Sequence, residues 1–295
     1  MGTYSIKELA YLSGIKAHTI RIWEQRYSII TPERTQTNIR TYTDFDLRHL
    51  LNVSFLNHNG YKISKIAKLT VTEILKLVDS ITIKKADYPI QINSLILAMV
   101  NLDEIRFNQV VKLQTESEGF ERTAIHIILP FLERVGILWQ TGDINPAQEH
   151  FISGLIRQKL IAAIDALPIQ TDSDSLKFLL FLPEGEWHEI GLLFGYFLVK
   201  KKGFRALYLG QSLPLPDLEN TVKLYQPQVL ISALTSCMSP HKLVEYSQNL
   251  TQVFPDQTIL LSGSQILKYR EDLPKEIHIL ETIHSLVDYL ATVQR

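Results

Sequence analysis

The sequence predicts a multidomain protein. It begins with a small winged helix-turn-helix, continues with a central four-helix bundle, and ends with an α/β doubly wound (Rossmann/flavodoxin-like) domain on a five-stranded parallel sheet. Its 295 residues exceed a typical single domain, which suggests two or three units. Apolar residues recur at helical spacing up to about residue 175 and then collect into short continuous runs, a pattern typical of buried parallel strands. We expect domains at 1–75, 76–172 and 173–295.

The charge of the chain is unevenly distributed. Residues 1–70 hold ten Lys and Arg against five Asp and Glu, so this segment carries about +5, and the remainder, with 20 against 26, carries about −6. Such an asymmetry is typical of a small nucleic-acid-binding head on an acidic body. The apolar runs are shorter than a membrane span needs, and the N-terminus lacks a signal pattern. We therefore expect a cytoplasmic protein without a membrane partner.

Cys237 is the only cysteine of the chain. It excludes an intrachain disulfide framework and an all-cysteine zinc site. With no nucleophilic partner in the pattern, it is interpreted as a small buried residue. No Ser/His/Asp arrangement, phosphate-cradling glycine loop or pair of carboxylates at the strand ends indicates hydrolysis or phosphoryl transfer, so we expect a protein that is not an enzyme.

The first segment, YSIKELAYLSGIKAHTIRIWEQRY, predicts two short helices separated by a glycine turn. Ser5 and Glu8 have the spacing of a capping box at the first helix, and Gly14 supplies the turn. The second helix, about residues 17–26, is expected to bury Ile20 and present a polar face. A short helix, a turn and a polar second helix make a helix-turn-helix whose second helix can enter a major groove.

The residues that follow sharpen this interpretation: a polar, basic segment begins at Pro32, and Thr43 then caps a further helix. With LNHNGYKISKIAKL as a fourth helix, this segment resembles the MerR family of transcription regulators. The matching residues are Ile6, Leu9, Ala10, Gly14, Thr19, Ile20, Arg21, Trp23, Glu24, Pro32, Arg34, Arg40, Tyr42 and Asp46.

The resemblance implies binding of double-stranded DNA. Residues of the second helix would approach base edges or phosphates, and residues of the wing would contact the DNA sugar-phosphate backbone. The expected DNA-binding residues are Lys16, His18, Thr19, Arg21, Arg26, Arg34, Arg40 and Tyr42. The alternative is a helical module that binds protein.

Residues 71–175 predict three or four helices that form a bundle, because apolar residues recur there at spacings of three and four residues. One end of the bundle holds Trp139 and, after nine intervening residues, Glu149 and His150. Asn145-Pro146 starts a new helix, so all three side chains can face one bundle end. As bare chemistry this group is ambiguous between packing and ligation.

From residue 176 onward, five apolar runs alternate with amphipathic helical segments, which predicts a parallel sheet covered on both faces. The runs are LKFLLFLP, RALYLGQ, QVLISALT, TILLSGSQ and IHIL. Ligands of such sheets bind at the carboxyl ends of the strands. Polar or small residues follow four of the runs: EGEWHEIG at 184–191, Gly210-Gln211-Ser212, Ser232 to Thr235, and Ser262-Gly263-Ser264.

This pattern resembles the cobalamin-binding signature. Its residues are Glu186, His188 and Gly191, then, after 40 residues, Ser232 and Leu234, then, after 28 residues, Gly263. The resemblance implies that His188 ligates cobalt from below, that Glu186 accepts its other ring N–H, and that Gly191 and Ser232 border the displaced nucleotide tail. Ser264 stands where a second glycine is usual.

The domain order and both motifs together resemble the photoreceptor repressors of the CarH/LitR type, which carry adenosylcobalamin. The bundle would then cap the upper corrin face, with Trp139 and Glu149 over the upper axial group and His150 as the upper ligand after photolysis. The resemblance implies a dark dimer or tetramer that binds operator DNA and is released by light. The alternatives are a MerR-type regulator of the same architecture that is cobalamin-independent or senses another signal, and a corrinoid-carrying methyltransferase subunit.

Overall fold

The computed structural model describes residues 3–35, 37–80, 88–141, 145–171 and 175–293, with backbone only at 79–80 and 137–141. The chain forms two compact units, Met1–Leu155 and Ile156–Arg295, and each is described by itself. In the part of the chain that is described, no helix is long and apolar enough to span a membrane.

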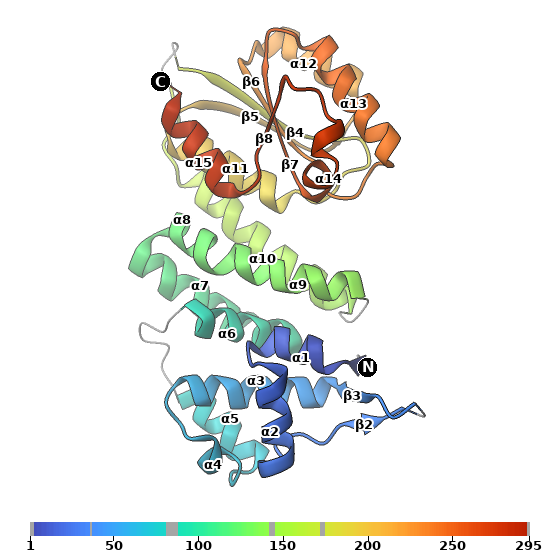
Figure 1. The fold of residues 1–295 in the computed structure, drawn as a ribbon. Coiled ribbons are helices and arrows are strands. Elements are labelled where there is room, and N and C mark those ends of the chain that lie inside the picture. The colour runs from blue at the N-terminus through green and yellow to red at the C-terminus, as the bar shows by residue number, and fades with distance from the viewer. Residues whose placement is uncertain (1–2, 36, 81–87, 142–144, 172–174, 294–295) are drawn as a thin grey trace. The chain divides into compact units, whose positions relative to one another are not determined.

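The helix-turn-helix predicted from the sequence is present at the start of the first unit (Figure 1). Helix α1 (Ile6–Ser13) begins with the Ser5–Glu8 capping box and ends at Gly14, whose φ of 68° is a left-handed conformation. Helix α2 (Ala17–Tyr27) follows and buries Ile20 and Trp23. The glycine thus turns the chain between two helices that pack on each other through their apolar faces.

A small antiparallel sheet and three more helices complete the head. Strands β1 (Thr3–Tyr4), β3 (Arg40–Thr43) and β2 (Glu33–Arg34) pair in that order, and the turn between β2 and β3 is the predicted wing. Thr43 and Asp46 form a capping box at the start of α3 (Asp44–His58). Helices α4 (Ile63–Ile66) and α5 (Val71–Ser80) pack against α3.

The helical region expected after the head consists of α6 (Tyr88–Asn101), α7 (Glu104–Glu118), α8 (Phe120–Thr123), a π-helical turn η1 (Ala124–Ile128), α9 (Leu129–Thr141) and α10 (Pro146–Asp165). Helix α6 is buried from Ile90 to Val100 because it packs against α3 of the head as well as against α7 and α9. The predicted helical region is therefore confirmed.

A buried polar network joins the head to this region. The carbonyl of Ser13, the last residue of α1, accepts hydrogen bonds from Ser54 Oγ at 3.0 Å and Asn93 Nδ2 at 3.3 Å. Asn93 Oδ1 in turn accepts from Arg134 Nη1 at 3.0 Å, and burial lowers the pKa of the Arg134 guanidinium. The turn of the helix-turn-helix is thereby tied to α6 and α9.

The second unit contains the predicted five-stranded parallel sheet, in the order β5-β4-β6-β7-β8. Helices α12 (Leu215–Tyr225), α13 (Pro240–Val253) and α14 (Ser264–Lys268) share one apolar cluster with the sheet, whereas α11 (Ile190–Lys201) packs with α15 (Ile283–Thr292) (Figure 1). A 3-10 turn, η2 (Arg270–Asp272), precedes β8. The strands are β4 (Lys177–Pro183), β5 (Arg205–Leu213), β6 (Val229–Ala233), β7 (Thr258–Ser262) and β8 (Ile277–Ile279).

The strand order places a switch point between β4 and β6. From β4 the chain passes outward to β5 on one side and then returns to β6 on the other. Loops at the carboxyl ends of such strands diverge and leave room for a ligand. The loop after β4, which holds Glu186 and His188, begins at this point.

Candidate functional site

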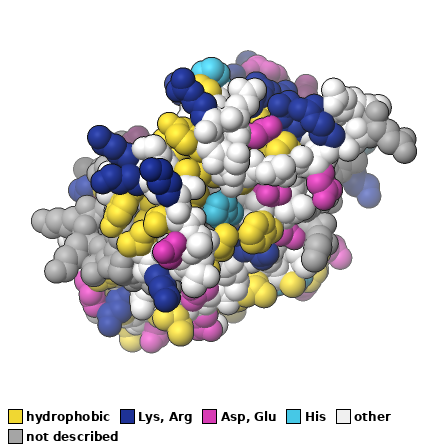
Figure 2. Space-filling view, turned by 90° about the horizontal axis from the view of Figure 1, so that it is seen from below, with side chains coloured by type: hydrophobic (Ala, Val, Ile, Leu, Met, Phe, Trp, Pro, Cys, Tyr) yellow, Lys and Arg dark blue, Asp and Glu magenta, His cyan; other side chains and the backbone are white. Residues whose placement is uncertain are grey.

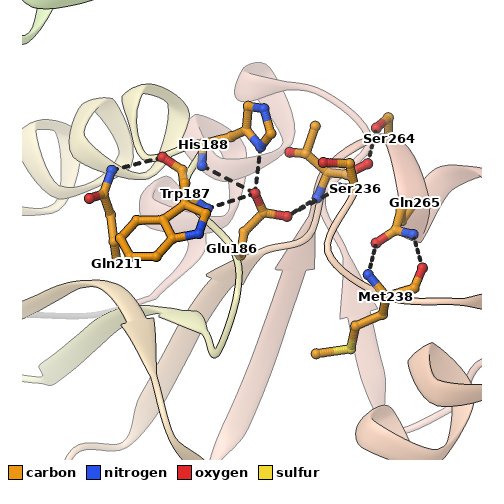
Figure 3. A network of polar contacts seen from close by, with 9 residues as sticks. Glu186, Trp187, His188, Gln211, Ser236, Met238, Ser264 and Gln265 are labelled. Carbon is orange, nitrogen blue, oxygen red and sulfur yellow. Dashed lines mark hydrogen bonds and ion pairs between the residues drawn. The ribbon is translucent and has the colours of Figure 1, made fainter.

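The centre of the candidate site is a histidine held by a buried carboxylate (Figure 3). His188 Nδ1 lies 2.5 Å from Glu186 Oε1, and the two residues are separated by one position in the loop after β4. The His188 side chain is 58% exposed, whereas that of Glu186 is only 1% exposed. The exposed ring is fixed at Nδ1 by a buried carboxylate. Histidines that ligate metals are commonly supported in this way.

Glu186 is ionised because the fold surrounds it with donors. Its Oε2 accepts the backbone N–H groups of Thr235 at 2.7 Å and Ser236 at 3.2 Å, from the loop after β6, and its Oε1 accepts those of Trp187 and His188. Burial by itself would raise the pKa of Glu186, but the hydrogen bonds from His188, Thr235 and Ser236 outweigh it and hold the pKa well below the usual range. The carboxylate thus joins both sides of the switch point.

The end of β5 holds the other side of the His188 loop. Gln211 Nε2 donates to the Trp187 carbonyl at 2.7 Å (Figure 3). The Gly185 N–H donates to Ser212 Oγ at 3.1 Å. The sequence placed residues 210–212 after the second strand, but β5 continues to Leu213. The difference arises from an irregular register, with Gly210 and Ser212 both at positive φ.

The signature residues on β6 and β7 lie beneath the loops. Ser232, which the resemblance places beside the nucleotide tail, is buried, and its hydroxyl donates to the Phe181 carbonyl at 2.8 Å. Leu234 is also buried. Gly263 has a φ of 104°, and a Cβ there would lie 2.2 Å from the Leu234 carbonyl oxygen, so only glycine fits.

Ser264, which stands where a second glycine is usual, joins two loops. Its hydroxyl donates to the Thr235 carbonyl at 2.9 Å, and the side chain of the next residue, Gln265, bonds both the N–H and the carbonyl of Met238 (Figure 3). The loop after β6 is therefore fastened to the start of α14. A ligand tail that passes between them would replace or widen these contacts.

Two further features fit a bulky cofactor at this edge of the sheet. A Cβ added at Gly191 would have nothing within 4 Å, so the backbone is open there. The buried hydroxyl of Tyr246 lacks a hydrogen-bond partner among the described residues, and burial raises its pKa.

Cys237 is half-buried beside Glu186, and burial, with that carboxylate, raises the pKa of its thiol to about 12, as expected for a structural cysteine.

The second candidate group lies at the start of α10. His150 Nδ1 is 2.9 Å from Glu149 Oε2, and Ser153 Oγ donates to Glu149 Oε1 at 2.6 Å. The His150 side chain is exposed, so its ring is accessible. Trp139 falls in α9, but its side chain lies outside what the structure describes.

The expected DNA-binding residues mostly lie on exposed surface. Lys16, His18, Arg21 and Arg26 are exposed on or beside α2, Thr19 is half-buried, and Arg34 is exposed in the wing, where it donates to Asn38. Figure 2 views the end of the first unit that contains α2 and α4 and shows Lys and Arg side chains in separate groups.

Two of the wing residues turn inward instead. Arg40 Nε lies 3.2 Å from Glu24 Oε1, and the Tyr42 hydroxyl donates to Glu24 Oε2 at 3.4 Å. Tyr42 is fully buried, and burial together with Glu24 raises its pKa to about 12. The expectation that Tyr42 grips the DNA backbone is corrected, because its ring belongs to the core and its hydroxyl braces α2 against β3.

Comparisons with known proteins agree with a regulator that combines a DNA-binding head with a ligand-binding body. Residues 4–71 match the MerR HTH family regulatory protein model, and residues 91–163 match the B12 binding domain model. The second match spans α6 to most of α10. The chain therefore carries a MerR-type helix-turn-helix and a B12-binding domain.

Two curated relatives are similar over most of the chain. The HTH-type transcriptional repressor CarH of Myxococcus xanthus is 29% identical over 86% of this chain and 86% of its own. The repressor CarA of the same organism is 24% identical over 88% of this chain and 86% of its own. Among solved structures, the monomethylamine corrinoid protein of Methanosarcina barkeri shares the fold, with 14% identity, a TM-score of 0.53, and coverage of 66% of this chain and 95% of that chain. The two family matches and the two repressor relatives support a B12-binding, MerR-type transcriptional regulator that binds double-stranded DNA.

Proposed function

We propose that the protein is a cobalamin-dependent, light-responsive transcriptional repressor that carries adenosylcobalamin. The observation that carries the proposal is the His188–Glu186 pair at the switch point of the sheet, in a chain with a MerR-type head and a B12-binding helical region. The head favours a regulator over a methyl-group carrier. Acting on chromosomal DNA, such a regulator would work in the cytoplasm.

His188 would be the lower axial ligand of cobalt. With the Nδ1 proton committed to Glu186, Nε2 is the nitrogen that would coordinate the metal. The ionised carboxylate keeps the ring in one tautomer and raises its basicity. The nucleotide tail of the cofactor would pass beside Gly191 and between the loops after β6 and β7, near Leu234 and Gly263.

The residues at the start of α10 would serve the upper face. Bound adenosylcobalamin would supply a cobalt–carbon bond that visible light cleaves. We infer that Glu149 lines the space of the upper group and that His150 is the candidate upper ligand after light exposure. Glu149 holds the His150 ring, and the exposure of that ring allows it to turn away.

Repression would depend on assembly. A dimer or tetramer presents several heads to one operator, and linking the heads raises their effective concentration without any new base contact. A ligand that favours the assembled state must bind that state more tightly than the separate subunits. Light would then weaken DNA binding by removing the group that favours assembly.

Size-exclusion chromatography with light scattering tests this function. The full chain would be compared without cofactor, with adenosylcobalamin in the dark, and after green-light exposure. We expect the largest species only in the dark with the cofactor, and we expect His188→Ala to prevent its formation. His241→Ala, an exposed histidine on α13, is the matched control. The same mass in all three conditions for the unaltered protein would contradict the proposal.

A further inference from the structure

The residue that follows the candidate ligand is held from two sides. Glu189 Oε1 accepts a hydrogen bond from Arg157 Nε at 2.6 Å, and its Oε2 accepts one from the Tyr208 hydroxyl at 2.9 Å. Arg157 lies on α10 and Tyr208 on β5. The Glu189 side chain is only 13% exposed, so its charge requires these partners.

Glu189 also fixes the backbone around His188. Its N–H donates to the Trp187 carbonyl at 2.9 Å, which makes His188 the central residue of a tight turn, and its own carbonyl accepts from Leu193 in the first turn of α11. Glu186 holds the ring of His188 from below, whereas Glu189 holds the turn that presents it. The Glu186 carboxylate thus fixes the ring, whereas the Glu189 backbone closes the turn and the Glu189 carboxylate anchors that residue to Arg157 and Tyr208.

The two donors to Glu189 differ in their surroundings. The Tyr208 ring is stacked on Tyr196 at 5.4 Å between centroids, and burial, together with Glu189, raises the pKa of the Tyr208 hydroxyl. Arg157 instead reaches the site from α10, and its side chain is 42% exposed. Because α10 is one helix from Pro146 to Asp165, Arg157 lies two turns after His150 in that helix.

We propose that Arg157 is a positioning residue for His188: through the Glu189 carboxylate it fixes the turn that presents the imidazole. It also links that turn to the helix that carries His150. The proposal rests on the proposed function, in which His188 is the lower ligand of cobalt. Arg157 contacts the Glu189 carboxylate, and through that residue it acts on His188 indirectly.

The test compares Arg157→Ala with Arg157→Lys in the full chain. Lys159→Ala, which removes a cation two residues away on α10, is the matched control. Two quantities are measured: the visible spectrum with adenosylcobalamin in the dark, which reports whether a histidine nitrogen is the lower ligand, and amide hydrogen exchange of residues 185–193 without cofactor.

For Arg157→Ala we expect retained folding, a mixed spectrum with part of the histidine-ligated signature lost, and exchange of the turn faster by roughly fivefold to tenfold, as for one partly exposed charged hydrogen bond. Arg157→Lys should retain part of the histidine-ligated spectrum and part of the slow exchange of the turn. Lys159→Ala should change neither the spectrum nor the exchange. Unchanged spectrum and exchange in Arg157→Ala would overturn the proposal.

The outcome for the unaltered protein separates this proposal from the proposed function. Loss of the corrinoid on desalting of the unaltered protein would refute the function, and ligation of cobalt by His188 would fall with it. Exchange of the turn in the cofactor-free variants would still decide whether Arg157 fixes its conformation.

Discussion

Replacing Glu186 with glutamine tests the site through its hydrogen bonds. Glu186 Oε2 accepts two backbone N–H groups, and Oε1 accepts two more together with His188 Nδ1. Either orientation of the amide turns an NH₂ group toward at least two backbone donors. Since each buried donor without a partner costs roughly 1–3 kcal/mol, we expect a loss of about 3 kcal/mol in the local stability of the two loops.

Hydrogen exchange measures this loss locally, which avoids the assumption that a chain with two units unfolds in one step. A loss of about 3 kcal/mol corresponds to exchange faster by about a hundredfold where the loops open as a unit. The peptides to follow are 184–189 and 233–238, and Glu184→Gln, an exposed carboxylate in the same loop, is the control. Equal exchange in Glu186→Gln and Glu184→Gln would refute the hydrogen-bond account.

Four other outcomes follow from the structure. The low pKa of Glu186 means that its stabilisation is fully present above pH ~5 and lost as the pH falls below the ordinary carboxyl value of about 4.3, so acid unfolding of the second unit should be shallower in Glu186→Gln. Gly263→Ala should prevent folding of the second unit, whereas Gly185→Ala, which has open space around the added Cβ and only the strain of a φ of 81°, should cost about 1–2 kcal/mol by urea titration. Arg21→Ala should weaken binding to duplex DNA and lower the slope of log affinity against log salt by about 1. Asn93→Ala should lower the thermal stability of the first unit by about 2 kcal/mol, because it removes a buried amide and leaves the half-buried Arg134 guanidinium without its acceptor.

The elements of the fold were predictable because their signals are local. Ser5, Thr43 and Gly14 mark helix ends through bonds to residues at most three positions away, and the apolar runs of the sheet are continuous. The packing of α6 against the head was not predictable. It depends on Asn93 meeting Ser13, 80 residues earlier, and nothing in the spacing of the chain encodes that contact.

The candidate site was likewise only partly predictable from the sequence. The pairing of His188 with Glu186 followed from a two-residue spacing, and the structure brings the two together. The N–H donors of Thr235 and Ser236 were missed because backbone groups carry no sequence signal, although the strand-end rule brought their loop to the same edge. Tyr42 was misplaced because an aromatic residue in a wing can face either DNA or the core, and only burial distinguishes the two.

The central claim, that His188 holds a corrinoid, is tested most directly by the visible absorption spectrum of the full chain. The protein is incubated in the dark with adenosylcobalamin, desalted, and measured before and after green light, with His188→Ala beside it. The account predicts a retained corrinoid band that shifts irreversibly with light, and loss of the histidine-ligated signature in the variant. A spectrum without corrinoid after desalting, or an identical spectrum in His188→Ala, would contradict it.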